Sequence, residues 1–453
     1  MWGADQRRWL AATVVAVVLF VLVGASADNA ARPSLAPSGW APGLWLPFAL
    51  SPAAVTGCLW AAYLIGGIGT YAALRAAPRG RLASLPWWPI VALGLLVLVT
   101  QPFGSADHVN YAAYGRIWVD SGDPYTQSPI AWAGGTDPVT SRVESPWTTA
   151  PSVYGPVATL LQGLTAVLGG DNLRQVVWCW QVVCVLAWLA TRWLLRRLTD
   201  DHARVEVLWT LNPLVLGLGV FGAHVDLVAV PFAVAAIVLV GRSPAAAGML
   251  AGLAAATKVT YAAVLAGLVL AWWLHERPRF ARRLALGLGA ALVTLAVVHL
   301  PFGRHTYDQL LAVRRSVSLA TPWRLLLDGL SGTFGSPAMR TVISIGAAVL
   351  ALALAGLLWR LTEGLAHGSP QGVVVRVTLV LTTAYTLAAP YSLPWYDMLT
   401  WALLPVLAAS VLDAVLLARG VVMAWAYVPG RVLGMTPGVE RVTLGFRRYV
   451  APY

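Results

Sequence analysis

The sequence has few charged side chains and few cysteines, and each scarcity excludes a class of protein. Charged residues make up only 11% of the 453 positions, whereas a soluble domain carries about 25%. The three cysteines, Cys58, Cys179 and Cys184, all lie in apolar stretches, so no disulfide framework or zinc-ligand spacing is present. No GxxxxGK[ST] motif occurs, which argues against a cytosolic nucleotide as donor or energy source.

Apolar residues, by contrast, are abundant and form long runs. Hydrophobic types make up 58% of the chain, and apolar runs of 15 to 20 residues recur along it. Such runs are typical of membrane-spanning helices, so the sequence predicts an all-α polytopic membrane protein. The first run follows Arg7 and Arg8 like a signal peptide, but we expect it to be retained as a span. We expect about twelve spans, within a range of 11–13, at roughly 9–25, 48–73, 86–101, 173–195, 205–220, 224–241, 244–257, 259–274, 284–300, 340–360, 373–389 and 395–417.

The distribution of basic residues predicts how these spans are oriented. The net charge of +12 is spread over short clusters between apolar runs, which favours membrane topology over nucleic-acid binding. We place the N-terminus inside and treat the apolar stretch 155–168 as an interfacial, half-inserted helix. With that arrangement, 21 basic residues fall inside and 10 outside. The long loops 101–172 and 301–339 then both lie on the outer face.

The chain is predicted to form one integral-membrane catalytic domain, residues 1–417, followed by a tail, residues 418–453. The tail mixes Val, Leu, Trp and Arg, which is typical of a helix lying on the cytoplasmic membrane surface. No internal repeat is visible, and the polar segments gather on one face. Both observations favour an enzyme over an inverted-repeat transporter.

The first outer loop begins with the most informative polar segment, QPFGSADHVNYAAYGRIWVDSGDPYTQSP. Asp107 follows a predicted span directly, and a carboxylate at a membrane edge is a functional candidate because an unpaired charge there is costly. We consider two roles for it: a general base that takes a proton from a sugar hydroxyl, or an N-cap for the helix that begins near Val109. The adjacent His108 is a candidate for substrate binding.

Aromatic residues follow Asp107 at short intervals. Tyr111, Tyr114 and Arg116 are expected on one side of the helix, where they could stack on a sugar or contact a phosphate. An aromatic belt at the membrane interface would show the same pattern. Tyr154, in the motif SVYGPV, marks a sharp entry into the half-inserted helix and has either a substrate-facing or a structural role.

Two short outer turns contribute further polar residues. The turn GAHVD carries His224 and Asp226, which we expect to form a hydrogen-bonded pair at the rim of the site, with helix capping as the alternative. Two ligands are too few to specify a metal. Lys258, the only lysine, is expected at the outer end of two short helices. There it could neutralise a phosphate leaving group, or it could simply extend to the interface.

The second outer loop and the last outer turn supply cations and aromatic rings. The segment HLPFGRHTYDQLLAVRRS contains His305, Arg314 and Arg315, which suit a phosphate, with solvated loop charge as the alternative. The turn PYSLPWYDML offers Trp395 and Tyr396, which would otherwise be interfacial belt residues.

In combination, these motifs resemble the GT-C glycosyltransferases that use polyprenyl-phosphate sugars. More narrowly, the chain resembles the actinobacterial polyprenol-phosphate-mannose-dependent α-mannosyltransferases, including the α-1,6 enzymes of lipomannan synthesis. The resemblance covers most of residues 80–400 and depends on order and spacing: Asp107, then NYAAYGR, GDPYT, YGP, LNPLV, GAHVD, Lys258 and PWY. The family commonly has GAHND where this chain has GAHVD, so Val225 is a departure.

The resemblance implies a GT-C fold with interfacial helices in the first outer loop. It also implies an inverting transfer of a sugar, with mannose expected, from a polyprenyl-phosphate donor to a lipid-linked glycan. Asp107 matches the family's catalytic carboxylate and would deprotonate the acceptor hydroxyl. Phosphate is already a good leaving group, so no general acid is needed. Lys258, Arg314, Arg315 and His305 are the candidate cations for its charge.

The partners and location are expectations from the same resemblance. We expect a lipid-linked sugar donor, a glycolipid or glycan acceptor and membrane lipids as partners, without nucleic acid, and we expect no cofactor or metal. The expected location is the bacterial plasma membrane, with the active site facing outside. Three alternatives remain open: an arabinofuranosyltransferase, a glucosyltransferase of the same fold, and a transporter or flippase for a lipid-linked sugar.

Overall fold

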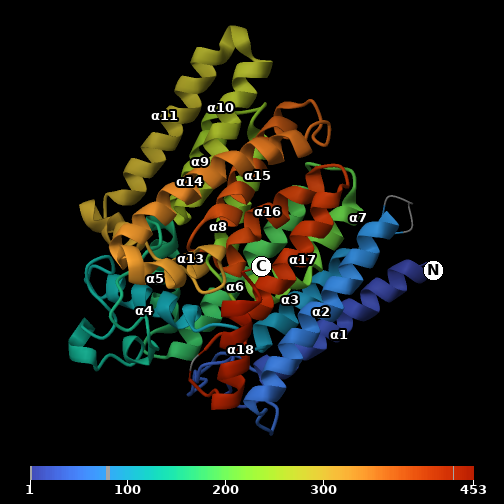
Figure 1. Cartoon of the computed structure of the whole chain (residues 1–453). Coiled ribbons are helices and arrows are strands. Elements are labelled where there is room, and N and C mark those ends of the chain that lie inside the picture. The colour runs from blue at the N-terminus through green and yellow to red at the C-terminus, as the bar shows by residue number, and fades with distance from the viewer. Residues whose placement is uncertain (1–2, 78–81, 432, 453) are drawn as a thin grey trace.

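The computed structural model describes residues 3–77, 82–431 and 433–452, and within them it contains helices and no strand. The β-type pairing in the described residues consists of one isolated bridge, between Asn29 and Arg32. The predicted all-α fold is therefore confirmed (Figure 1).

The helices are long at the N-terminus and interrupted in the middle of the chain. The α-helices are α1 (Ala4–Ala25), α2 (Pro52–Ala76), α3 (Trp87–Val99), α4 (Asp107–Val119), α5 (Pro156–Gly169), α6 (Leu173–Leu195), α7 (His202–Val205), α8 (Asp226–Leu239), α9 (Pro244–Thr257), α10 (Ala263–His275), α11 (Phe280–His299), α12 (Asp308–Val313), α13 (Pro322–Phe334), α14 (Ser336–Leu361), α15 (Pro370–Ala388), α16 (Met398–Leu403), α17 (Val411–Tyr427) and α18 (Pro437–Tyr449). Short 3-10 or π segments are η2 (Trp132–Gly135), η3 (Thr140–Arg142), η4 (Glu206–Thr210), η5 (Val215–Phe221), η6 (Val259–Ala262), η7 (Arg277–Arg279), η8 (Gly303–Tyr307), η9 (Pro394–Asp397) and η10 (Leu404–Val406).

Among the described residues, six helices are long and apolar enough to cross a membrane. They are α1, α2, α6, α11 with η7, α14 and α15. A seventh candidate is the pair His202–Thr210 and Val215–Phe221, which is bent by 63°. Helices α3, α5, α8 and α9 and the segment Val259–His275 are apolar but shorter. The multi-pass architecture is thus confirmed, whereas the predicted 11–13 spans are reached only if the shorter helices also cross.

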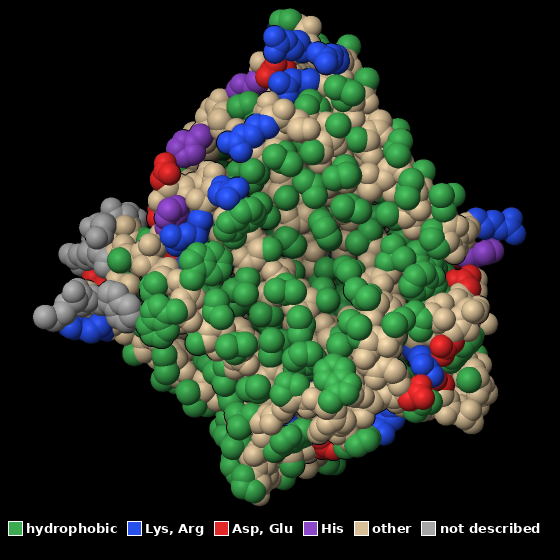
Figure 2. Space-filling view, turned by 180° about the vertical axis from the view of Figure 1, so that it is seen from behind, with side chains coloured by type: hydrophobic (Ala, Val, Ile, Leu, Met, Phe, Trp, Pro, Cys, Tyr) green, Lys and Arg blue, Asp and Glu red, His purple; other side chains and the backbone are tan. Residues whose placement is uncertain are grey.

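The outer surface of the helices suits a lipid environment. Figure 2 shows a broad hydrophobic face with charged side chains confined to its margins. Large apolar side chains stand exposed on α11 and α14, for example Leu292 at 65% and Leu352 at 76%. In water such a face would be strongly unfavourable, so it supports burial of these helices in a bilayer.

The centre of the molecule is an interrupted helical segment that leads to the GAHVD turn. Every residue from 204 to 230 is buried. The span predicted at 205–220 is bent here because Pro213 supplies no backbone N–H, and the Asn212 side chain accepts from Leu214 N at 2.9 Å to begin a new turn. The turn after η5 meets the first outer loop, where His224 Nε2 lies 3.1 Å from Ser105 Oγ.

The span predicted at 395–417 is wrong. Helix α16 ends at Leu403, the segment η10 contains Pro405, and α17 begins only at Val411. Ser410 and Asp413 form a capping box at the start of α17. Because a capping box satisfies the free N–H groups of a helix start, these residues begin a separate helix.

The C-terminal segment lies at the same end of the molecule as the first outer loop, which corrects the predicted arrangement. Helix α17 begins where Asp413 pairs with Arg204 at 2.9 Å, and its 17 residues extend for about 25 Å. Beyond it, Arg431 Nη2 lies 2.5 Å from Glu144 Oε1 in the loop 101–172. Tail and loop therefore share one face, and the boundary predicted at residue 417 falls inside α17.

This placement weakens the charge count on which the predicted orientation depended. Five arginines lie in residues 418–453. When they are counted on the same side as the first outer loop, the basic residues inside fall from 21 to 16 and those outside rise from 10 to 15. The clusters around α7 and at the turn between α10 and α11 still lie at the other end of the molecule from α18 (Figure 1). They retain the positive-inside signal.

Buried ion pairs hold the arginine-rich end together. The side chains of Arg192 and Glu206 are both 0% exposed, with 2.6 Å between Arg192 Nη2 and Glu206 Oε1. Arg196 Nη1 lies 2.9 Å from the same oxygen. One carboxylate thus pairs with two guanidinium groups, and it joins the end of α6 to η4, which leads into the interrupted core.

We expect Glu206→Gln to lower the free energy of unfolding by about 3 kcal/mol or more, because it leaves Arg192 buried without its counter-charge. Thermal or denaturant unfolding of the purified protein in detergent measures this. Glu276→Gln is the matched control, since the Arg283–Glu276 pair is partly exposed and such pairs contribute about 0–1 kcal/mol. Equal losses in the two variants would contradict the role of Glu206.

Candidate functional site

Asp107 is the first residue of α4, immediately after the loop that follows α3. The N-cap position belongs to Ala106, and no side chain caps this helix. The alternative role of Asp107 as an N-cap is therefore not seen. Its backbone N–H donates instead to Ser105 Oγ at 3.2 Å, and 14% of its side chain is exposed.

His224 is the nearest ionisable neighbour of Asp107. Its Nε2 lies 3.6 Å from Asp107 Oδ2 and 3.1 Å from Ser105 Oγ. Its Nδ1 lies 2.5 Å from the carbonyl oxygen of Leu218. A carbonyl can only accept, so Nδ1 carries the proton and Nε2 of the neutral ring accepts from the Ser105 hydroxyl. Ser105 thereby connects the backbone of Asp107 to the imidazole.

The imidazole is held in place by an aromatic ring and by a constrained turn. Trp395 stacks on His224 with 3.8 Å between ring centroids and 18° between planes. Ala223, one residue earlier, has a φ of 52°, and its carbonyl accepts from Trp180 Nε1 at 2.8 Å. Positive φ is uncommon outside glycine, so this contact supports a backbone shape that presents His224 to Asp107.

Asp226 and Lys258 form an ion pair beside this centre. Lys258 Nζ also lies 3.7 Å from the ring centroid of Tyr396, and Tyr261 OH donates to the Asp226 carbonyl at 2.7 Å. The second carboxylate oxygen of Asp226 is buried without a hydrogen-bond partner among the described residues. The prediction that His224 and Asp226 bond to each other is wrong, since each has a different partner.

Three tyrosines pack together after Asp107: Tyr111 and Tyr114 on α4, and Tyr154 in the turn before α5. The rings of Tyr111 and Tyr154 meet edge to face at 5.1 Å, and Tyr114 lies 6.2 Å from Tyr154. Gly155 allows this turn to lie against α9, because a Cβ there would come within 2.1 Å of the Ala256 carbonyl oxygen. Tyr154 is thereby brought next to the turn that carries Lys258.

Burial raises the pKa of the Asp107 carboxyl to about 7. The charge of Asp226 adds to the rise, and the charge of Lys258 opposes it. A carboxyl with a pKa near neutrality can accept a proton more readily than an ordinary one. Its low exposure and the nearby carboxylate thus favour proton transfer.

Of the predicted residues, the structure brings together nine. They are Asp107, Tyr111, Tyr114, Tyr154, His224, Asp226, Lys258, Trp395 and Tyr396. Their helices and turns are far apart in sequence, so the grouping is a property of the fold.

Arg116 is not part of this group, which corrects the expectation that it shares a helix face with Tyr111. It lies nine residues after Asp107, which is half a turn off in phase and about 13 Å along the axis. Its guanidinium forms ion pairs with Asp120, Asp137 and Asp171 at 2.8, 3.0 and 2.6 Å. These pairs engage Nε and Nη2 of Arg116 and hold the first outer loop together.

His108 and the cations of the second outer loop are also placed elsewhere. His108 is 0% exposed, and neither ring nitrogen has a hydrogen-bond partner among the described residues. His305 pairs with Asp308 at 2.6 Å with 42% of its side chain exposed, and Arg314 and Arg315 are exposed. The phosphate-binding role predicted for these three cations has no geometric support.

The sequence interpretation missed Ser105. A Ser two residues before the helix start is a local side-chain-to-backbone motif, and this spacing could have indicated it. Within residues 3–77, 82–431 and 433–452, no group of three or more His, Cys, Asp and Glu side chains is placed to hold a metal ion.

Comparison with known proteins identifies a family and two relatives. Residues 9–276 match the family model described as "Alpha-(1->6)-mannopyranosyltransferase, N-terminal domain". "Alpha-(1->6)-mannopyranosyltransferase A" of Mycobacterium tuberculosis is 27% identical over 324 residues, which are 66% of this chain and 61% of that protein. "Probable alpha-(1->6)-mannopyranosyltransferase" of Mycolicibacterium smegmatis is 32% identical over 133 residues, or 28% of this chain and 24% of that one. No solved structure matches.

The family match includes Asp107, His224, Asp226 and Lys258 and ends before Trp395 and Tyr396. The matched region spans about 61% of the length of the M. tuberculosis relative. Since the family model covers more than half of the chain, the chain belongs to the alpha-(1->6)-mannopyranosyltransferase family.

Proposed function

We propose that the protein is an inverting glycosyltransferase. It moves mannose from a polyprenyl-phosphate donor to a hydroxyl of a lipid-linked glycan on the outer face of the membrane. The arrangement around Asp107 supports this best: a weakly exposed carboxylate lies 3.6 Å from His224, and its pKa is raised to about 7. In this proposal Asp107 acts as the base, and the charge of Lys258 acts on it from nearby.

The proposed reaction is a single displacement at the anomeric carbon of the donor sugar. The acceptor hydroxyl gives its proton to Asp107, the acceptor oxygen bonds to the anomeric carbon, and the bond from that carbon to the phosphate oxygen breaks. Polyprenyl phosphate leaves with the electron pair. Because an inverting displacement changes the anomeric configuration, an α-linked product requires a donor whose mannose is β-linked to phosphate.

The other residues have supporting roles in this proposal. Ser105 and His224 fix the orientation of Asp107 through the contacts described above. Lys258 is already paired with Asp226, so the arriving phosphate would share its charge with that carboxylate. Tyr111, Tyr114 and Tyr154 present ring faces and edges beside the carboxylate, where a sugar ring can pack. Asp107 thus acts as base, and the residues around it hold the two sugars.

We expect Asp107→Asn to reduce mannosyl transfer by about 10²-fold or more while leaving the fold intact, because Asn has nearly the same shape and cannot accept the proton. Transfer of radiolabelled mannose from polyprenyl-phosphate-mannose to a membrane glycolipid extract measures this. Asp120→Asn is the control: it lies at the other end of α4 with 37% of its side chain exposed. Near-normal transfer by Asp107→Asn would rule out the proposed base.

The pH dependence of transfer follows from the raised pKa of Asp107. The base must be ionised, and a raised pKa means that the ionised form is lost as the pH falls through about 7. We therefore expect kcat/KM to fall by about tenfold per pH unit below that point. Initial rates between about pH 5 and 8.5 test this. A rate that stays constant down to about pH 5 would indicate an ordinary carboxyl or another base.

The outer location of the site can be tested by cysteine labelling. Ser141, Tyr449 and Asp200 are all exposed, and the first two lie at the end that holds the site. We expect cysteines at Ser141 and Tyr449 to react with a membrane-impermeant thiol reagent added to intact cells, and a cysteine at Asp200 to react only after lysis. If only the cysteine at position 200 were labelled in intact cells, the proposed orientation would be wrong and the site would face the cytoplasm.

A further inference from the structure

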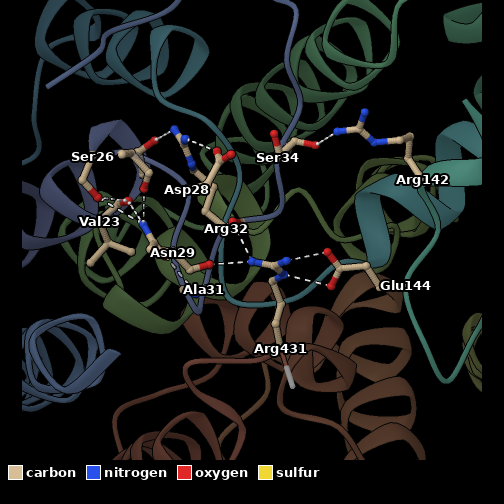
Figure 3. A network of polar contacts seen from close by, with 12 residues as sticks. Val23, Ser26, Asp28, Asn29, Ala31, Arg32, Ser34, Arg142, Glu144 and Arg431 are labelled. Atoms are coloured by element: carbon tan, nitrogen blue, oxygen red, sulfur yellow. Dashed lines mark hydrogen bonds and ion pairs between the residues drawn. The ribbon is translucent and has the colours of Figure 1, made fainter. Parts of the chain in front are cut away.

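Arg431, beyond the end of α17, makes an unusually complete set of contacts with two other segments. Its Nε and Nη2 lie 2.9 and 2.5 Å from the two carboxylate oxygens of Glu144. Its Nη1 lies 2.8 Å from the Arg32 carbonyl and 2.5 Å from the Asn29 carbonyl. Figure 3 shows this guanidinium between Glu144 and the turn at Asn29. Bidentate, charge-assisted contacts of this kind fix geometry as well as adding energy.

The turn that Arg431 binds is itself rigidly built. The amide of Asn29 donates to the Val23 carbonyl at 3.0 Å and accepts from Ala31 N at 2.9 Å. Arg32 pairs with Asp28 at 2.6 Å while being only 1% exposed. The Ala31 carbonyl then accepts from Gly104 N at 2.8 Å. The turn therefore holds the backbone of the first outer loop three residues before Asp107.

The residue before Arg431 holds the same backbone from the other side. Gly430 has a φ of 98°, and a Cβ built on it would lie 1.8 Å from Gly104 O and 3.0 Å from Ser105 N. Gly104 and Ser105 are thus held between Ala31 and Gly430. Ser105 is the residue that accepts from Asp107 N and contacts His224.

We propose that Arg431 is a positioning residue for Asp107. By joining Glu144, the turn at Asn29 and Gly430, it keeps Gly104 and Ser105 where they orient the carboxylate. The inference rests on the proposed role of Asp107. Arg431 itself does not touch the reacting atoms, and it lies outside residues 9–276, the segment that matches the family model.

Arg431→Gln should lower kcat for mannosyl transfer by about 10-fold to 10²-fold, the scale of a small misplacement of a catalytic group. The KM for the donor should change by less than about threefold. Arg431→Lys, which keeps the charge but not the bidentate fork, should recover part of the loss. Arg142→Gln is the matched control: Arg142 is an exposed arginine two residues before Glu144, and its side chain donates to the Ser34 carbonyl at 3.1 Å. Equal kcat values for Arg431→Gln and Arg142→Gln would overturn the inference.

A double-mutant cycle separates positioning from general destabilisation. If Arg431 acts through Asp107, then Arg431→Gln should cause no further loss of kcat in the Asp107→Asn background. A structural role would lower the activity of both backgrounds by the same factor, together with the yield of folded protein. Additive losses would therefore contradict the positioning role.

Hydrogen exchange gives a readout that does not depend on the reaction. In Arg431→Gln, backbone amides of residues 103–108 should exchange at least about tenfold faster than in Arg142→Gln. Unchanged exchange at these amides would overturn the inference even if no substrate had been found. Conversely, faster exchange with an inactive wild-type protein would refute the proposed function and leave the structural link intact.

Discussion

The cost of an unpaired charge in a weakly polar interior is the constraint on which this structure depends. At the arginine-rich end Glu206 pairs with both Arg192 and Arg196. At the other end Asp226 pairs with Lys258. Among the described residues no cation pairs directly with Asp107: a neutral imidazole lies 3.6 Å from its carboxylate, and Lys258 acts on it only through its charge. Asp107 is thus a carboxylate that is only partly compensated. An incompletely compensated carboxylate that is largely buried has a strong tendency to take up a proton, which is the chemical property required of a base.

Much of the fold could be predicted from the sequence because long apolar runs have few solutions in a bilayer. The errors occurred where helices are interrupted. Pro213 and Pro405 lie inside apolar runs, and hydrophobicity alone does not distinguish a broken segment from a continuous span. The position of the C-terminal tail was missed for a different reason. Its side is decided by the Arg431–Glu144 pair, which joins residues 287 positions apart, and no local pattern encodes such a contact.

The candidate site shows the same division between local and long-range information. Asp107, Tyr111 and Tyr114 were found because positions i, i+4 and i+7 share a helix face. Arg116 was misplaced because the same periodicity sets it on the opposite face, where its carboxylate partners lie. The pairing of Lys258 with Asp226 could not be read from the sequence. A lone cation beside a hydrophobic run does not indicate which carboxylate the fold will bring to it.

The chemistry and its support come from different parts of the chain. The residues closest to the proposed reaction lie within the segment that matches the family model, residues 9–276. Trp395, which stacks on His224, and Arg431, which holds the backbone before Asp107, both lie beyond it. A reactive carboxylate at a helix start directly after a loop needs outside support, because loop backbones are otherwise mobile. Here a turn after α1 and the segment after α17 provide that support from two sides. The C-terminal third of the chain therefore acts on the proposed base without carrying the reactive group.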